Sequence, residues 1–167
     1  MEQETQQDKT AGKVVRFEVP GRPSPKERHR TVAFAGADGR VHMRSYTPRT
    51  TEIFENRVGM CFIAAARDID TGDGGFPFSG NVAIEIRAFF TVPKSYSKKR
   101  RQECAGETRY YSHKPDSDNI VKAVLDGLNH VAYKDDSSVV SVRATKLYGN
   151  RDRTEVTITE CGDDSAR

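Results

Sequence analysis

The sequence predicts an α+β domain: a small mixed β-sheet with two main helices packed on one face. Two segments, 47–67 and 118–129, carry apolar residues at helical spacing. Residues 82–92 alternate between apolar and polar side chains, which is typical of a half-buried strand. Further strand-like segments precede, separate and follow these elements. At 167 residues and without an internal repeat, the chain fits a single domain.

The N-terminal half is expected to hold a strand, a hairpin and a helix. Residues 14–19 are rich in valine and form the first expected strand, which ends at Pro20-Gly21. A basic loop with three prolines follows, from Pro20 to about Arg30. Residues 31–46 are expected to form a ragged hairpin. Thr47-Pro48 then begins the first helix, because proline is favoured at an early helical position.

The C-terminal half alternates strands with helical segments. After the strand 82–92, residues 93–107 are basic and predict a loop or a short helix. The second main helix covers 118–129, where apolar residues fall on one arc of the helix. Two strands, 139–148 and 154–160, complete the domain.

Composition places the chain among globular proteins. It is 35% hydrophobic and 31% charged, with a net charge of +3 that permits a polyanionic partner without requiring one. No apolar run approaches the roughly 20 residues of a membrane span. Three well-separated cysteines and the absence of a signal peptide favour a reducing cytoplasm. We expect disordered tails at 1–12 and 162–167 around one folded domain at 13–161.

Acidic residues surround the second helix. Asp116 and Asp118 stand two apart before it, Lys122 follows one turn later, and Asp135-Asp136 comes after it. Carboxylate oxygens are the ligands that Mg²⁺ prefers, and Mg²⁺ commonly leaves positions for phosphate and water. Such a site suits metal-assisted hydrolysis of phosphodiesters.

A simpler interpretation is that Asp118 caps the helix and pairs with Lys122, which contributes only a few tenths of a kcal/mol. A helix needs one cap, so this interpretation leaves Asp116 unexplained. It also leaves the later acidic pair, Asp135-Asp136, without a role. We therefore prefer the carboxylate cluster.

The motifs Lys-Pro-Asp-Ser-Asp-Asn-Ile-Val-Lys-Ala-Val-Leu-Asp-Gly-Leu-Asn and Ala-Tyr-Lys-Asp-Asp-Ser-Ser-Val-Val resemble the signature of RusA-type Holliday junction resolvases (crossover junction endodeoxyribonucleases). The resemblance is strong over residues 113–149. It implies a RusA-like fold and a bacterial or phage-encoded, Mg²⁺-dependent homodimer, with Mn²⁺ as a substitute ion. Such enzymes cut four-way junctions by paired symmetric nicks in recombination or repair. The resemblance makes Asp116, Asp118 and Asp136 metal ligands and Lys122 an essential lysine, with Asp135 as the second choice of ligand.

The implied chemistry assigns roles to the neighbouring residues. A metal held by the aspartates would activate water and neutralise the scissile phosphate, while Lys122 stabilises developing charge. Asn119 and Asp126 are candidates for orienting the ligands. For Asp126, an ordinary solvated helix face is an equal alternative.

Basic segments are candidates for DNA contact, because lysine and arginine neutralise backbone phosphates. Candidate DNA-binding residues are Lys26, Arg28, Arg30, Lys98, Lys99, Arg100 and Arg101. Tyr110, Tyr111 and His113 either stack on unpaired bases or pack against a strand, and the sequence leaves both open.

Two alternative functions are a nuclease that cuts a broader range of branched or flap DNA, and a non-catalytic DNA-binding module. Loss of an acidic ligand would mark the second, and none is missing. A homodimer is expected because a four-way junction has two-fold symmetry. The chain also carries a surplus of apolar side chains for its size, with the aromatic ones at Phe54, Phe62, Phe89 and Phe90.

Overall fold

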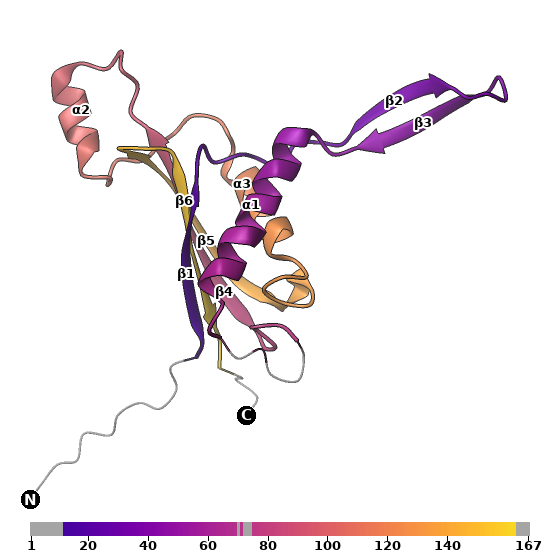
Figure 1. Ribbon diagram of the computed structural model, residues 1–167. Helices are drawn as coiled ribbons and strands as arrows, with labels where there is room; N and C mark the ends of the chain where they lie inside the picture. The colour runs from indigo at the N-terminus through magenta and orange to yellow at the C-terminus, as the bar shows by residue number, and fades with distance from the viewer. Residues whose placement is uncertain (1–11, 70, 72–74, 163–167) are drawn as a thin grey trace, which may run out of the picture.

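The computed structural model describes residues 12–69, 71 and 75–162 and shows the expected α+β fold (Figure 1). Its strands are β1 (Val14–Pro20), β2 (Arg30–Ala35), β3 (Val41–Tyr46), β4 (Val82–Thr91), β5 (Val139–Gly149) and β6 (Arg153–Glu160). Its helices are α1 (Arg49–Ala65), α2 (Lys98–Ala105) and α3 (Ser117–Leu128), with a 3₁₀ turn, η2 (Asp136–Ser138). The tails predicted at 1–12 and 162–167 lie almost entirely outside the described residues. Within the described part of the chain, no helix is long and apolar enough to cross a membrane.

The main sheet has four strands in the order β1-β6-β4-β5. β4 pairs in parallel with β5 and antiparallel with β6, so the predicted mixed sheet is confirmed. β1 forms the other edge, antiparallel to β6. A parallel pair needs a long crossover connection. The crossover from β4 to β5 contains α2 and α3, and it therefore contains every residue of the acidic segment.

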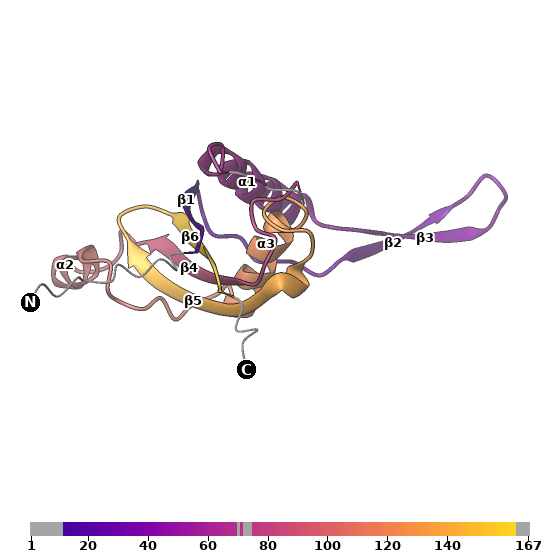
Figure 2. The same cartoon turned by 90° about the horizontal axis from the view of Figure 1, so that it is seen from below.

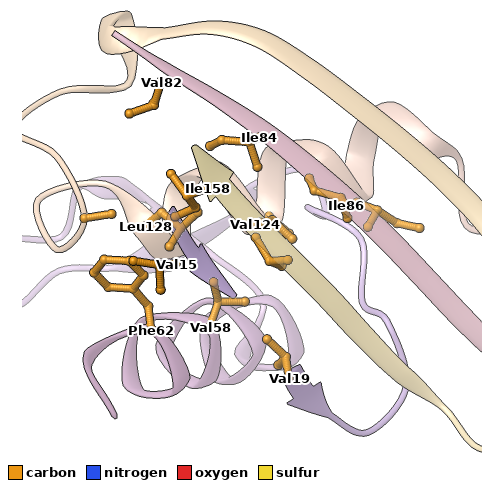
Figure 3. Close-up of a cluster of buried hydrophobic side chains, with 14 of the residues drawn as sticks. Val15, Val19, Val58, Phe62, Val82, Ile84, Ile86, Val124, Leu128 and Ile158 are labelled. Carbon is orange, nitrogen blue, oxygen red and sulfur yellow. The ribbon is translucent and has the colours of Figure 1, made fainter. Parts of the chain in front are cut away.

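α1 and α3 cover one face of this sheet, as predicted (Figure 1). Their buried side chains meet those of β4 and β6 in one core, shown in Figure 3. Val58 and Phe62 of α1 face Val124 and Leu128 of α3 across this core, and all four are at most 1% exposed. The spacing of four residues within each pair puts the two side chains on one side of the helix.

Two glycines let α1 and α3 cross at close range. A Cβ atom on Gly127 would lie 2.6 Å from the backbone oxygen of Glu55 and 2.8 Å from Cβ of Val58. A Cβ atom on Gly59 would lie 3.0 Å from the backbone oxygen of Gly127. The position of α3 on the body therefore depends on the absence of side chains at this crossing.

Two elements extend away from the body on opposite sides (Figures 1 and 2). The predicted hairpin is present as β2 and β3, which form a separate two-stranded sheet. The basic segment after β4 forms the short helix α2. Its N-cap is Ser97, whose hydroxyl accepts a hydrogen bond from the Arg100 backbone at 3.3 Å.

Two expectations are wrong in detail. The N-cap of α3 is Asp116, not Asp118, because the helix begins at Ser117. The apolar surplus expected at four phenylalanines does not exist, because each is at most 2% exposed: Phe54, Phe62, Phe89 and Phe90. Phe54, Phe62 and Phe90 pack in the main core, and the guanidinium groups of Arg87 and Arg153 lie over the ring of Phe89.

Candidate active site

The loop before α3 is held to strand β5 by one lysine. Lys146 Nζ donates hydrogen bonds to the backbone oxygens of His113 and Pro115, both at 2.8 Å. The backbone of Tyr111 also donates to the Lys146 oxygen at 2.9 Å. These bonds fix the residue just before Asp116 to the end of the sheet. Sequence analysis missed Lys146, which reads there as an ordinary strand lysine.

Three charged side chains lie on the first two turns of α3. Asp116 is exposed and, although it is the N-cap, its side chain makes no capping hydrogen bond. Asp118 lies in the first turn, and its carboxylate contacts Lys122 Nζ at 3.4 Å. Both members of this pair are more than half exposed, so it contributes little to stability. The three groups are therefore available to a ligand at small energetic cost.

A second lysine ties α1 to α3. Lys26 Nζ contacts Glu55 Oε1 at 2.6 Å and Asp126 Oδ2 at 2.7 Å. Burial alone would lower the pKa of Lys26, but the hydrogen bonds to Asp126 and Glu55 raise it above its ordinary value. The Lys26 backbone also donates to the Asn119 oxygen at 2.8 Å. Lys26 and Asp126 thus form a structural bridge, and the predicted DNA contact of Lys26 would require breaking both ion pairs.

A cleft of about 490 Å³ opens between residues 22–26 and the start of α3. Its lining residues are Arg22, Pro23, Ser24, Pro25, Lys26, Lys114, Pro115, Asp116 and Asn119. Asp116 supplies an acceptor to the cleft, and Arg22 and Lys114 supply cations, so the cleft can hold an anion together with a cation. Arg22 was not singled out from the sequence, where it is one basic residue in a proline-rich loop.

The two later aspartates differ in their surroundings. Asp135 caps η2, and its Oδ1 accepts a hydrogen bond from the Ser137 backbone at 2.9 Å. The hydrogen bonds from Ser137 lower the pKa of Asp135. Asp136 is exposed and makes no such capping bond. The pKa of the buried Tyr133 is raised first by burial and then by the charges of Asp136 and Asp126, so both carboxylates lie within electrostatic reach of its hydroxyl.

The predicted ligands are not gathered into one cluster. Among the residues that the structure describes, no group of three or more Asp, Glu, His or Cys side chains could hold a metal ion. Asp116 and Asp118 share the start of α3, while Asp136 begins η2. The donor chemistry still fits Mg²⁺, because this ion is usually bound by one or two carboxylates together with substrate phosphates.

Exposed cations flank the site on both sides. All four basic residues that begin α2 are exposed, and the Arg100 guanidinium lies 4.0 Å from the centre of the Tyr96 ring. Arg28 and Arg30 lie where the hairpin leaves the body, and Arg30 is exposed there.

Of the two tyrosines left open by the sequence, Tyr111 packs on Phe90 with ring centres 4.0 Å apart. Tyr110 is 77% exposed. Of these two tyrosines, Tyr110 is therefore the one whose ring is exposed for stacking on a base.

Comparison with known proteins bears on this arrangement. The model of a protein family described as Endodeoxyribonuclease RusA matches residues 20–159. The chain belongs to this family. The match includes the acidic segment, the cleft, both projecting elements, β4, β5 and nearly all of β6, but only the last residue of β1. The resemblance seen in the sequence motifs is thereby confirmed.

A relative from Bacillus subtilis (strain 168), named as the uncharacterized protein YqaN, is 34% identical over 148 residues. The alignment covers 87% of this chain and 96% of the relative. The relative thus spans the same domain, and its name assigns it no activity.

Proposed function

We propose that this RusA-family protein is a metal-dependent endodeoxyribonuclease that resolves four-way DNA junctions by paired symmetric nicks. The observation that carries the proposal is the start of α3, where Asp116 lines a cleft that is also lined by cations, and Asp118 and Lys122 follow within the first two turns of the helix. The family match supplies the reaction class, and the site supplies groups suited to it.

Asp116 and Asp118 would hold Mg²⁺ or Mn²⁺, and Asp136 would complete the ligands once a phosphate is present. The bound ion would lower the pKa of a water molecule and neutralise the scissile phosphate. Lys122 stands one turn from Asp118, where its ammonium can stabilise charge on the phosphate as the bond breaks. Lys146 keeps Asp116 in position by holding the carbonyls of two residues in the preceding loop. Asp135 remains the second choice of ligand, because its carboxylate already caps η2.

The test separates cutting from binding. Asp116→Asn, Asp118→Asn and Asp136→Asn should each reduce cutting of a synthetic four-way junction by at least about 100-fold while affinity stays near wild type, because removing a negative charge does not repel DNA. Asp68→Asn is the matched control. Asp68 is exposed beyond the end of α1, so this variant should cut junctions as the wild type does. Flaps, Y-forks and linear duplex measured in parallel define the substrate range. Loss of binding together with cutting in all three variants would show that these residues are structural.

Metal dependence has its own measurement. Cutting should require Mg²⁺ or Mn²⁺, and Ca²⁺ should support binding without turnover. Full activity in excess EDTA would reject the metal site.

Symmetric nicking of a two-fold symmetric junction calls for two sites, so we propose an isologous homodimer. A stripe along the outer side of α1 offers an apolar surface: Ile53, Met60 and Ile63 are 46%, 71% and 59% exposed. A shallow, mostly apolar hollow lies along this stripe. Packing of two α1 helices would cover it.

Sedimentation over a range of protein concentrations tests the assembly. Met60→Lys should weaken self-association by at least about tenfold, because it places a charge in the centre of the interface. Val140→Lys is the control, since Val140 is 57% exposed on β5, away from α1. A wild-type monomer that still cuts junctions symmetrically would refute the dimer.

A further inference from the structure

The hairpin of β2 and β3, called here the arm, has no partner within the described chain. All twelve residues of its two strands are exposed, and both views show it projecting from the body (Figures 1 and 2). Each strand of six residues spans about 20 Å. A two-stranded hairpin alone is only marginally stable in water. We therefore expect the arm to be stabilised by a binding partner.

The register gives the arm two chemically different faces. Directly paired residues of an antiparallel hairpin share one face. One face carries the pairs Arg30 with Tyr46, Val32 with Arg44, and Phe34 with His42. The other carries Thr31 with Ser45, Ala33 with Met43, and Ala35 with Val41. The first face is thus basic and aromatic, and the second is small and apolar.

The charges of the arm favour an anionic occupant. Residues 30–46 contain three arginines and one acidic residue, Asp38. Asp38 sits at the turn, where His42 Nε2 and the Arg40 backbone contact its Oδ1, both at 3.1 Å. The strands themselves contain no carboxylate. Phe34 and His42 stack with ring centres 5.6 Å apart, which adds a flat surface of the kind that stacks on bases.

The root of the arm is fixed beside the carboxylate site. At one end, the Glu27 backbone donates to Thr51 Oγ1 at 3.2 Å, and Thr50 Oγ1 donates to Glu27 Oε1 at 2.8 Å. The preceding residue, Lys26, bridges α1 to α3 through Glu55 and Asp126. At the other end, β3 is followed closely by the start of α1. DNA held by the arm would consequently be held at a set position relative to the start of α3.

We propose that the basic and aromatic face of the arm binds one duplex arm of a branched DNA and presents Phe34 to the bases at the branch point, where the continuous stacking of a plain duplex is interrupted. A two-stranded β-ribbon fits the major groove of B-DNA, and its arginines would contact phosphates along the groove. This inference rests on the proposed function, and it adds to it the element that distinguishes a branch from a plain duplex.

The experiment measures binding of full-length protein to a four-way junction and to a linear duplex in EDTA, by fluorescence anisotropy over a range of salt. Arg30→Gln with Arg44→Gln should lower the slope of log affinity against log salt by about 1.8, at about 0.9 for each phosphate that is no longer neutralised. Phe34→Ala should weaken junction binding at least about fivefold and leave duplex binding unchanged. Arg16→Gln with Arg67→Gln removes the same charge from exposed sites elsewhere and should leave the slope unchanged.

Several outcomes overturn the proposal. One is an unchanged slope in the arm variant, and another is an equal change in the Arg16 and Arg67 control. A third concerns the apolar face: if Val41→Thr with Met43→Gln abolishes self-association while the arginine variant binds DNA normally, the arm docks onto a second copy instead. A wild-type protein that cuts no branched DNA with Mg²⁺ rejects the proposed function. If the wild type cuts branched DNA and the arm variants bind DNA as tightly as the wild type, the role of the arm is rejected and the proposed function stands.

Discussion

Substitution of Gly127 by alanine tests whether the close α1–α3 crossing requires a glycine at this position. Alanine in a helix interior is normally favoured over glycine by about 1 kcal/mol. Here the new Cβ atom would lie 2.6 Å from the Glu55 backbone oxygen, which cannot rotate away, and 2.8 Å from Cβ of Val58. Overpacking of this kind costs about 1–3 kcal/mol. With contacts this short we take the upper end, so the free energy of unfolding should fall by about 1–2 kcal/mol net.

Urea unfolding followed by circular dichroism measures this change. Gly59→Ala should have a smaller effect, because its Cβ atom would lie 3.0 Å from the Gly127 oxygen. Gly106→Ala is the control: it lies at the end of α2 with φ of −76°, and its Cβ atom would meet only Thr108 Oγ1 at 3.8 Å. Its stability should change by less than about 0.5 kcal/mol. A Gly127→Ala protein as stable as wild type, or a Gly106→Ala protein equally destabilised, would refute the reasoning.

Two further predictions concern α2 and the sheet. Replacing the basic residues of α2 by alanine should weaken junction binding and lower its salt slope by up to about 0.9 for each phosphate that these side chains neutralise; an unchanged slope would remove α2 from the DNA surface. These residues are Lys98, Lys99, Arg100 and Arg101. Hydrogen bonds from Arg153, at 2.7 and 3.0 Å, lower the pKa of Glu107 below its ordinary value of 4.5. This stabilisation is complete above the pKa of Glu107 in the unfolded chain and is lost as the pH falls through its pKa in the folded protein. The thermal unfolding temperature of Glu107→Gln should therefore depend less on pH, between about 5 and 3, than that of the wild type. Identical pH profiles would show that the pair contributes nothing to stability.

The local patterns of the chain were enough to predict most elements. Alternation in 82–92 predicted β4, and helical spacing predicted the bounds of α1 and α3 closely. These signals are readable because side-chain direction follows the period of each element. The acidic motif around α3 was equally local, and the family it indicated is confirmed by the match over residues 20–159.

Long-range contacts decided what the sequence left unresolved. Lys26 reads as one more basic loop residue, yet it bridges Glu55 and Asp126, which are far from it in the chain. The four phenylalanines expected on the surface are buried, because their exposure depends on how α1 and β4 pack against the rest of the chain. The apolar residues of the arm are instead exposed, because no other element of the described chain packs against them.

By itself the sequence determined the fold class and the family, and it indicated the residues that we propose for the chemistry, since each of these inferences depends on residue type and short spacing. Tertiary structure alone decided that Lys146 anchors the loop before Asp116 and that glycines 59 and 127 set the approach of α3. It also decided that the hairpin stands apart with one basic and one apolar face. These features depend on pairing and packing between segments distant in the chain, for which no local pattern carries a signal.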